Sequence, residues 1–249
     1  MAPALRMAAL QKLRTITIAT HDSIGIGEDG PTHQPVAIPA FFRALPGIRL
    51  FRPADAEETL GAWTESIEAG FGPSMLCLSR QPVPLLPGSS RNKVALGAYV
   101  VLDPPAGTPP TLTLIATGSE VSRAVDVAKL LSATPYSFDV RVVSMPCQSL
   151  FDAQPASYRK EVLPSSSLVV AIEAWSSYGW ARYAHSSASM QSFGHSGPQA
   201  DLYEMFGFGE GNLAKVIGEW AGRWNGVGRL PGVGEFEELL LDFATGHVQ

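Results

Sequence analysis

The sequence predicts an α/β protein with two units, each built on a mostly parallel sheet. Short apolar runs recur along the 249 residues, and they are continuous rather than alternating, as in strands buried on both faces. Segments with helical apolar spacing separate these runs, so the chain follows the strand, turn and helix order of α/β proteins. Only 16% of the residues are charged, and 24 glycines and 20 prolines favour many short elements over a long-helix bundle.

The first half of the chain predicts three strands and one helix. The strands are expected at residues 15–20, 48–52 and 74–79. Asp55 is a candidate N-cap for a helix over residues 55–68, because acidic residues follow it in the first turn. Leu60, Trp63 and Ile67 recur at spacings of three and four, which predicts the apolar stripe of an amphipathic helix.

The second half of the chain also alternates predicted strands with predicted helices. Strands are expected at residues 111–117, 139–144 and 167–173. A turn at Gly118 leads into a predicted helix over residues 119–131, and a further helix is expected over residues 212–224. After a glycine-rich stretch, an acidic final helix is predicted over residues 236–243.

A proline-rich segment divides the chain. The sequence DPPAGTPP at residues 103–110 contains four prolines and cannot lie inside a helix or a central strand. We therefore expect one unit over residues 1–103, a linker over residues 104–110 and a second unit over residues 111–224. Residues 225–249 form a C-terminal extension.

Composition and charge exclude several classes of function. The net charge is −5 and no basic block is present, so neither nucleic acid nor an acidic membrane surface is an expected partner. Cys77 and Cys147 lie far apart in the sequence, which favours neither a disulfide framework nor a structural zinc site. The N-terminus has no signal-peptide core, and no run of 18 apolar residues occurs, so a cytoplasmic location is expected.

The window from residue 20 to residue 34, THDSIGIGEDGPTHQ, is the strongest candidate for chemistry. It follows a predicted strand and contains two histidines, three acids and three glycines. His21 and His33 can exchange a proton near neutral pH, and Asp29 can accept a hydrogen bond from a hydroxyl. A glycine-rich turn with solvated polar side chains explains the same composition. The spacing matches no GxGxxG, P-loop or HExxH motif.

The amino-acid sequence of this window resembles that of a known family. THDSIGIGEDGPTHQP resembles the active-site signature of the transketolases, a group of thiamine-diphosphate enzymes that includes the dihydroxyacetone synthases. The resemblance extends from about residue 3 to residue 220, and it includes FRPADAEE at 51–58, LSRQ at 78–81, IATGSEV at 115–121 and YEMFGF at 203–208. The FGHSGP segment at 193–198 looks slightly closer to dihydroxyacetone synthases.

The resemblance implies the transfer of a two-carbon ketol unit between sugar phosphates, with thiamine diphosphate and Mg²⁺ as cofactors. By position, His21 and His33 resemble the family's substrate-contacting, catalytic histidines, and Asp29 resembles the acid that reads the donor's hydroxyl configuration. Arg80 resembles the arginine that binds the substrate phosphate, a role suited to its forked guanidinium. The simpler interpretations are a capped turn at Asp29 and a surface ion pair at Arg80.

The resemblance begins inside the family's middle domain. It implies a truncated pyrimidine-binding domain followed by a transketolase-type C-terminal domain, without the diphosphate-binding domain or the glutamate that activates the pyrimidine. We therefore expect a chain that is inactive alone, binds thiamine diphosphate poorly, and either self-associates or needs a complementary transketolase N-terminal chain. The alternatives are a non-catalytic paralogue that binds a full-length transketolase, and a truncated gene product without selected function. A 2-oxoacid dehydrogenase β subunit shares the architecture, but the sequence of the window argues against it.

Several residues near the site have simpler expected roles. Pro39 predicts a shortened or kinked helix after the window, because proline inside a helix costs about 3 kcal/mol. Cys147 is expected to be a small core or loop residue, and His185 and His195 are expected to pack or turn rather than bind a ligand. The aromatic residues between 175 and 183 are either a ligand platform or one buried face.

Overall fold

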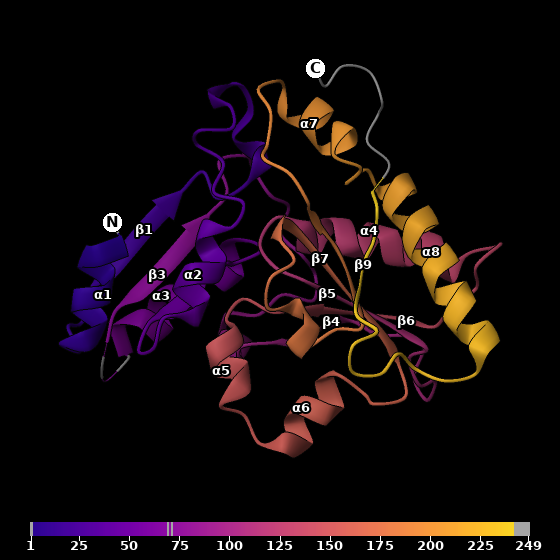
Figure 1. Cartoon of the computed structure of the whole chain (residues 1–249). Coiled ribbons are helices and arrows are strands. Elements are labelled where there is room, and N and C mark those ends of the chain that lie inside the picture. The colour runs from indigo at the N-terminus through magenta and orange to yellow at the C-terminus, as the bar shows by residue number, and fades with distance from the viewer. Residues whose placement is uncertain (1, 69, 71, 242–249) are drawn as a thin grey trace.

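The computed structural model describes residues 2–68, 70 and 72–241, and it contains two sheets that lie side by side (Figure 1). The first sheet has the strand order β1-β3-β2, and the second has the order β4-β6-β5-β7-β8-β9. Every described strand pair is parallel except β4 with β6, which confirms the α/β class with mostly parallel sheets. No helix in the described part of the chain is long and apolar enough to cross a bilayer.

The first sheet forms where the sequence predicts it. Its strands are β1 (Ile16–Thr20), β2 (Arg49–Phe51) and β3 (Ser74–Leu78), and its helices are α1 (Ala2–Leu10), α2 (Ile38–Ala44) and α3 (Ala56–Glu68). Leu5 of α1 and Phe42 of α2 pack with Met75 on one face of the sheet. On the other face, Leu76 packs with Ala62 of α3 and with the 3-10 helix η2 (Arg91–Leu96). The alternation of Met75 and Leu76 follows the pleat of a strand covered on both faces.

The second sheet is larger and is also covered on both faces. Its strands are β4 (Tyr99–Leu102), β5 (Leu112–Ala116), β6 (Val140–Ser144), β7 (Leu168–Ser176), β8 (Ser186–Met190) and β9 (Glu237–Glu238). The helices are α4 (Glu120–Ser132), α5 (Gln148–Asp152), α6 (Ala156–Val162), α7 (Gln199–Met205) and α8 (Glu210–Val227). One core cluster joins α4, α7 and α8 to one face, and a second joins α5, α6 and η3 (Trp180–Arg182) to the other.

Helix α3 begins as predicted but turns an unexpected face inward. The Glu58 amide donates a hydrogen bond to Asp55 Oδ1 at 3.0 Å, which confirms Asp55 as the N-cap. The apolar stripe of Leu60, Trp63 and Ile67 is exposed, at 44%, 37% and 58% of its possible area. The buried face instead carries Glu58 and three small residues, and the small residues let α3 approach η2 closely.

By strand pairing, the boundary between the two sheets lies before the proline-rich linker in the sequence. Strand β4 precedes residues 104–110, yet it pairs with β6 in the second sheet, where Tyr99 lies opposite Ser144. The two sheets therefore part between β3 and β4, and the prolines instead form the connection from β4 to β5. Prolines end a strand as readily as they end a domain, so their composition alone could not separate these cases.

The predicted final helix is wrong over residues 236–241. Strand β9 pairs with β8 there, and the Leu239 amide donates to Ser187 O at 2.8 Å. Leu239 and Leu241 are buried while Leu240 is exposed, which is the alternation of a strand. Residues 242 and 243 of the prediction lie outside the described residues.

Pro39 neither kinks nor interrupts a helix. It lies in the first turn of α2, where a missing amide hydrogen has no helical acceptor to lose. The helix begins there and runs for seven residues, so the expected cost of a proline inside a helix does not arise and no kink is present.

Candidate functional site

The candidate window lies at the carboxyl edge of the first sheet. Thr20 at the end of β1 pairs with Leu78 at the end of β3, so the two strands finish side by side. His21 follows β1 directly, and Arg80 follows β3 by two residues. The carboxyl ends of parallel strands are where α/β proteins bind ligands, and this edge presents both residues.

The window folds as a compact loop around η1 (Ile24–Asp29). Ile24 and Ile26 point inward and are fully buried, which leaves the polar side chains on the outside. Gly25 lets the buried amide of Gln81 lie against the loop, because a Cβ atom there would lie 2.4 Å from Gln81 Oε1. The loop after β1 is therefore packed against the segment that follows β3.

All four predicted site residues are exposed. The Nδ1 atoms of His21 and His33 lie 3.0 and 3.1 Å from the hydroxyl of the preceding threonine. Asp29 and Arg80 make no hydrogen bond or ion pair with any described residue, so neither the capped turn nor the surface ion pair occurs. The structure thus presents two imidazoles, a carboxylate and a guanidinium to solvent from two neighbouring segments.

The second unit holds the loop in place. Gln34 Nε2 donates to the His195 carbonyl at 3.0 Å, and Ser196 Oγ donates to the Glu28 carbonyl at 2.7 Å. The FGHSGP segment thus supports the window through a side chain and backbone groups. His195 takes part through its backbone, as expected of a turn residue.

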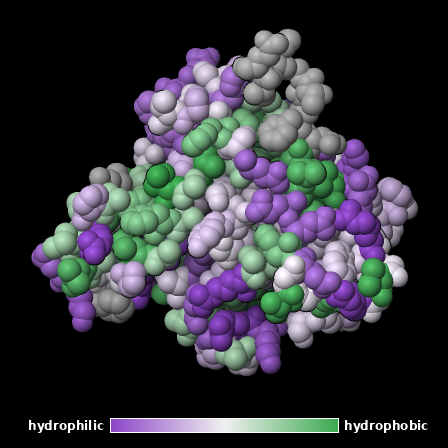
Figure 2. Space-filling model, viewed as in Figure 1, coloured by the Kyte–Doolittle hydropathy of each residue, from purple (hydrophilic) through white to green (hydrophobic). Residues whose placement is uncertain are grey.

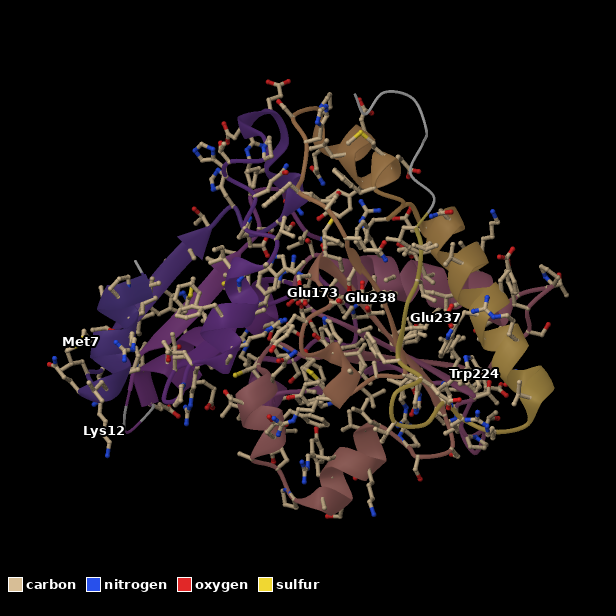
Figure 3. The ribbon with its side chains drawn as sticks, viewed as in Figure 1. Met7, Lys12, Glu173, Trp224, Glu237 and Glu238 are labelled. Carbon is tan, nitrogen blue, oxygen red and sulfur yellow. The ribbon has the colours of Figure 1, made fainter. Side chains whose placement is uncertain are left out.

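A buried cluster of charges lies directly beneath the window. Arg52, which is fully buried, donates through Nε to Asp22 Oδ2 at 2.8 Å and through Nη1 to Glu120. Glu173 lies 3.7 Å from the same Nη1 and forms a two-pronged pair with Arg43 at 2.7 and 2.8 Å. Figure 3 shows Glu173 at the junction between the two sheets.

The charges of this cluster stabilise one another. Burial alone would lower the pKa of Arg52, but the three carboxylates beside it raise that pKa well above its usual value. Burial would likewise raise the pKa of Glu173, but Arg43 and Arg52 lower it. Gly118 leaves room for the arginine, because its φ is +55° and a Cβ there would lie 2.8 Å from Arg52 Nε. The arginine side chain also lies over Trp175, 4.3 Å from the ring centroid.

This charge cluster positions the predicted site, and sequence reasoning missed it. Asp22 is adjacent to His21, whose φ of 65° is a strained value for a residue with a Cβ. Arg52 connects that loop to Glu120 and Glu173 of the second unit. The signal was present in the FRPAD and IATGSEV segments, which contain Arg52 and Glu120, but spacing alone gave no reason to pair them.

The other singled-out residues are structural. Cys77 and Cys147 are free, buried thiols, and burial raises the pKa of both, to about 12 for Cys77. His185 accepts a hydrogen bond from the Val169 amide through Nδ1 at 3.0 Å, which confirms it as a packing residue. Trp175 and Trp180 are buried, so these two rings pack in the core and form no open ligand platform.

The described residues offer no complete cofactor site. Among residues 2–68, 70 and 72–241, no three histidine, cysteine, aspartate or glutamate side chains are grouped so that they could hold a metal ion. The carboxylates of the charge cluster are buried and paired with arginine, so they are not available to a cation. The edge of the first sheet presents side chains that can bind hydroxyls and an anionic group, and the described residues add no carboxylate cluster for Mg²⁺.

Comparisons with known proteins agree with this division. Residues 1–84 match the transketolase pyrimidine-binding domain family, and residues 97–209 match the transketolase-like C-terminal domain family. A probable transketolase of Schizosaccharomyces pombe is 45% identical over 86% of this chain, and dihydroxyacetone synthase of Candida boidinii is 46% identical over 87%. These values are too close to favour one enzyme over the other. The chain spans about a third of each relative, 31% and 30%.

Solved structures give the same result. A transketolase of Pichia stipitis in complex with sedoheptulose 7-phosphate has a TM-score of 0.85 and 39% identity, covering 90% of this chain and 32% of its own. A split-gene transketolase, solved as an inactive β4 tetramer, has a TM-score of 0.67 and covers 86% of this chain and 68% of its own. At 23% identity the second likeness shows the fold alone. With both domain families matched in order, the chain belongs to the transketolase family.

Proposed function

We propose that this chain supplies the sugar-binding part of a thiamine-diphosphate-dependent ketol transferase whose active site is completed by another chain. The observation that supports the proposal is that four polar side chains are exposed in the segments that follow strands β1 and β3. His21, Asp29, His33 and Arg80 have the residue types that bind a hydroxylated, phosphorylated substrate, and all four are exposed rather than enclosed in a pocket. Alone, the chain is therefore expected to be inactive.

Each of the four side chains has a stated role in this proposal. His21 and His33 hydrogen-bond the hydroxyl groups near the reacting carbonyl and exchange protons with them. Asp29 accepts a hydrogen bond from a substrate hydroxyl and so distinguishes its configuration. Arg80 binds the phosphate through its forked guanidinium, with two parallel donors.

The cofactor requires residues from elsewhere. Thiamine diphosphate supplies the ketol-transfer chemistry of the family, and in this proposal its diphosphate and Mg²⁺ are held by the other chain, since the described residues group no three metal-ligating side chains. This chain contributes the binding and orientation of the sugar. The free thiols of Cys77 and Cys147 fit the reducing cytoplasm in which we place it.

The surface of the first unit supports a protein partner. Hydrophobic surface gathers over this unit in Figure 2, and α3 exposes its apolar stripe of Leu60, Trp63 and Ile67. Strand β1 pairs with β3 alone among the described strands, so its other edge is open. We assign this surface to a complementary transketolase N-terminal chain, because the curated relatives are about three times as long as the matched region. Without that chain, the same surface favours self-association.

Isothermal titration of the isolated chain tests the proposal. Xylulose 5-phosphate should bind with millimolar or weaker affinity, because a solvated arginine–phosphate contact contributes only about 0–1 kcal/mol. Thiamine diphosphate with Mg²⁺ should bind no better. Arg80→Ala should remove the weak preference for the phosphorylated sugar over dihydroxyacetone.

A micromolar dissociation constant for thiamine diphosphate would contradict the proposal, because it would require a cofactor site within this chain. If the chain instead bound a full-length transketolase tightly and changed its rate, the non-catalytic paralogue would replace the present proposal.

A further inference from the structure

A cavity lies in the second unit, where helices α5 and α6 meet η3. Its volume is about 270 Å³, and its walls include Phe151 and Tyr183 together with Arg159, Lys160 and Arg182. Hydrophilic side chains gather over this part of the molecule in Figure 2, around α5 and α6. None of these residues belongs to the proposed sugar-binding edge of the first sheet.

The charges around the cavity do not balance. Asp152 is the carboxylate of the lining, and Arg182 pairs with it at 3.1 Å while the Tyr183 hydroxyl donates to it at 3.0 Å. Arg159 and Lys160 have no ion pair with any described residue. Two positive charges thus remain uncompensated in a chain whose net charge is −5, and an anion would compensate both.

The guanidinium of Arg159 also contains a hydrogen-bond donor that has no acceptor. Its Nε is inaccessible to solvent and has no partner among the described residues. A buried donor without an acceptor is costly, and the penalty is larger for a charged group. A rotation of this side chain toward an anion in the cavity would exchange the unmet donor for a charge-assisted hydrogen bond.

The floor of the cavity is apolar and aromatic. Phe151 and Tyr183 lie with their ring centroids 6.3 Å apart, and Arg182 lies 5.7 Å from the Tyr183 centroid. Burial and the nearby Asp152 raise the pKa of Tyr183, so its hydroxyl remains a donor to that carboxylate at neutral pH. Phe151 is 1% exposed and its ring is tilted by 53° from that of Tyr183, so the half-buried Tyr183 ring is the aromatic surface available beside the two uncompensated cations.

We propose that this cavity is a binding site for a small aromatic phosphate monoester. The phosphate would lie between Arg159 and Lys160, and the ring would rest against Tyr183. A dianion fits two uncompensated cations better than a monocarboxylate does, and the volume is close to the lower end of small-molecule sites, about 300 Å³.

Titration of the whole chain with phenyl phosphate tests this site. Phenyl phosphate should bind at least tenfold more tightly than inorganic phosphate, and phenol should bind more weakly than either. The double variant Arg159→Gln with Lys160→Gln should weaken phenyl phosphate at least tenfold. Lys129→Gln, which removes an exposed charge on α4, should leave the affinity unchanged.

Two arms separate this site from the sugar-binding edge. Arg80→Ala removes the other candidate phosphate ligand, and phenyl phosphate should bind that variant as it binds the parent chain. Equal affinity in the parent and the double variant would overturn the proposal, and so would equal affinity for phenyl phosphate and inorganic phosphate. Thermal unfolding of each variant establishes that the loss of binding is not a loss of the fold.

Discussion

The two units differ in how completely they bury their apolar surface. In the second unit, α4 and α8 cover one face of the sheet and α5 and α6 cover the other, with Trp180 and Trp220 fully buried. In the first unit, the sheet has three strands, and α3 exposes its apolar stripe. The second unit has helices over both faces of its sheet, and the first presents an apolar helix stripe that another polypeptide would cover.

The buried charge cluster connects these unequal units, and its loss should have the largest effect. Arg52→Met would leave Asp22, Glu120 and Glu173 as buried carboxylates without their shared cation. We expect a loss of about 3–5 kcal/mol in the free energy of unfolding. Urea unfolding followed by circular dichroism measures it.

Lys129→Met provides the matched control, because that cation lies in an exposed ion pair with Asp126. A loss in Arg52→Met no larger than in this control would show that the cluster does not hold the units together.

Acid should weaken the same connection. The pKa of Glu173 lies below its usual value of 4.5, so its contribution to stability is complete above that pH and is lost as the pH falls through the lowered pKa. Each pKa unit of difference corresponds to about 1.4 kcal/mol. Urea midpoints between pH 6 and pH 3 should fall less steeply in Glu173→Gln than in the parent chain. Parallel curves would remove Glu173 from the acid response.

Substitutions in the apolar stripe of α3 should change association more than stability. Leu60→Gln with Ile67→Gln replaces two exposed apolar side chains, so the free energy of unfolding should change by only about 0.5 kcal/mol per site. Light scattering should show self-association of the parent chain and less of it in the variant. Ala62→Gln, on the buried face of the same helix, should instead unfold the first unit. A monomeric parent chain at high concentration would contradict the account of this surface.

The sequence predicts which segments form strands and helices better than it predicts which of these elements pack together. Apolar runs such as residues 167–173 identify strands because a parallel strand is buried on both faces, and those strands were found. Strand β8 was missed, since SSASM contains few apolar residues and its burial comes from the neighbouring strands β7 and β9. Its place in the sheet is a tertiary property that local composition does not encode.

Helix α3 shows why periodicity does not decide which face is buried. The spacing of Leu60, Trp63 and Ile67 correctly predicts a helix but points to the wrong side. Gly61 decides the packing, because a Cβ there would lie 2.4 Å from the Arg91 carbonyl of η2. Large residues could not make that close contact, so the small-residue face turns inward.

The candidate site likewise has a part that the sequence predicts and a part that it does not. Three of its four residues lie in one window of sequence, and the fourth follows the adjacent strand, so the parallel pairing brings His21 and Arg80 to one edge, with Asp29 and His33 further along the same loop. The charge cluster beneath them joins Asp22, Arg52, Glu120 and Glu173 across about 150 residues of sequence, and no spacing rule connects residues so far apart.

A ketol-transfer assay tests the central claim, that this chain is one part of a shared active site, most directly. The isolated chain would be compared with its mixture with the preceding part of the Schizosaccharomyces pombe relative, in thiamine diphosphate and Mg²⁺. We predict no turnover by either chain alone and turnover by the mixture, with Arg80→Ala slowing phosphorylated substrates more than dihydroxyacetone. Robust cofactor-dependent turnover by the isolated chain would contradict the account.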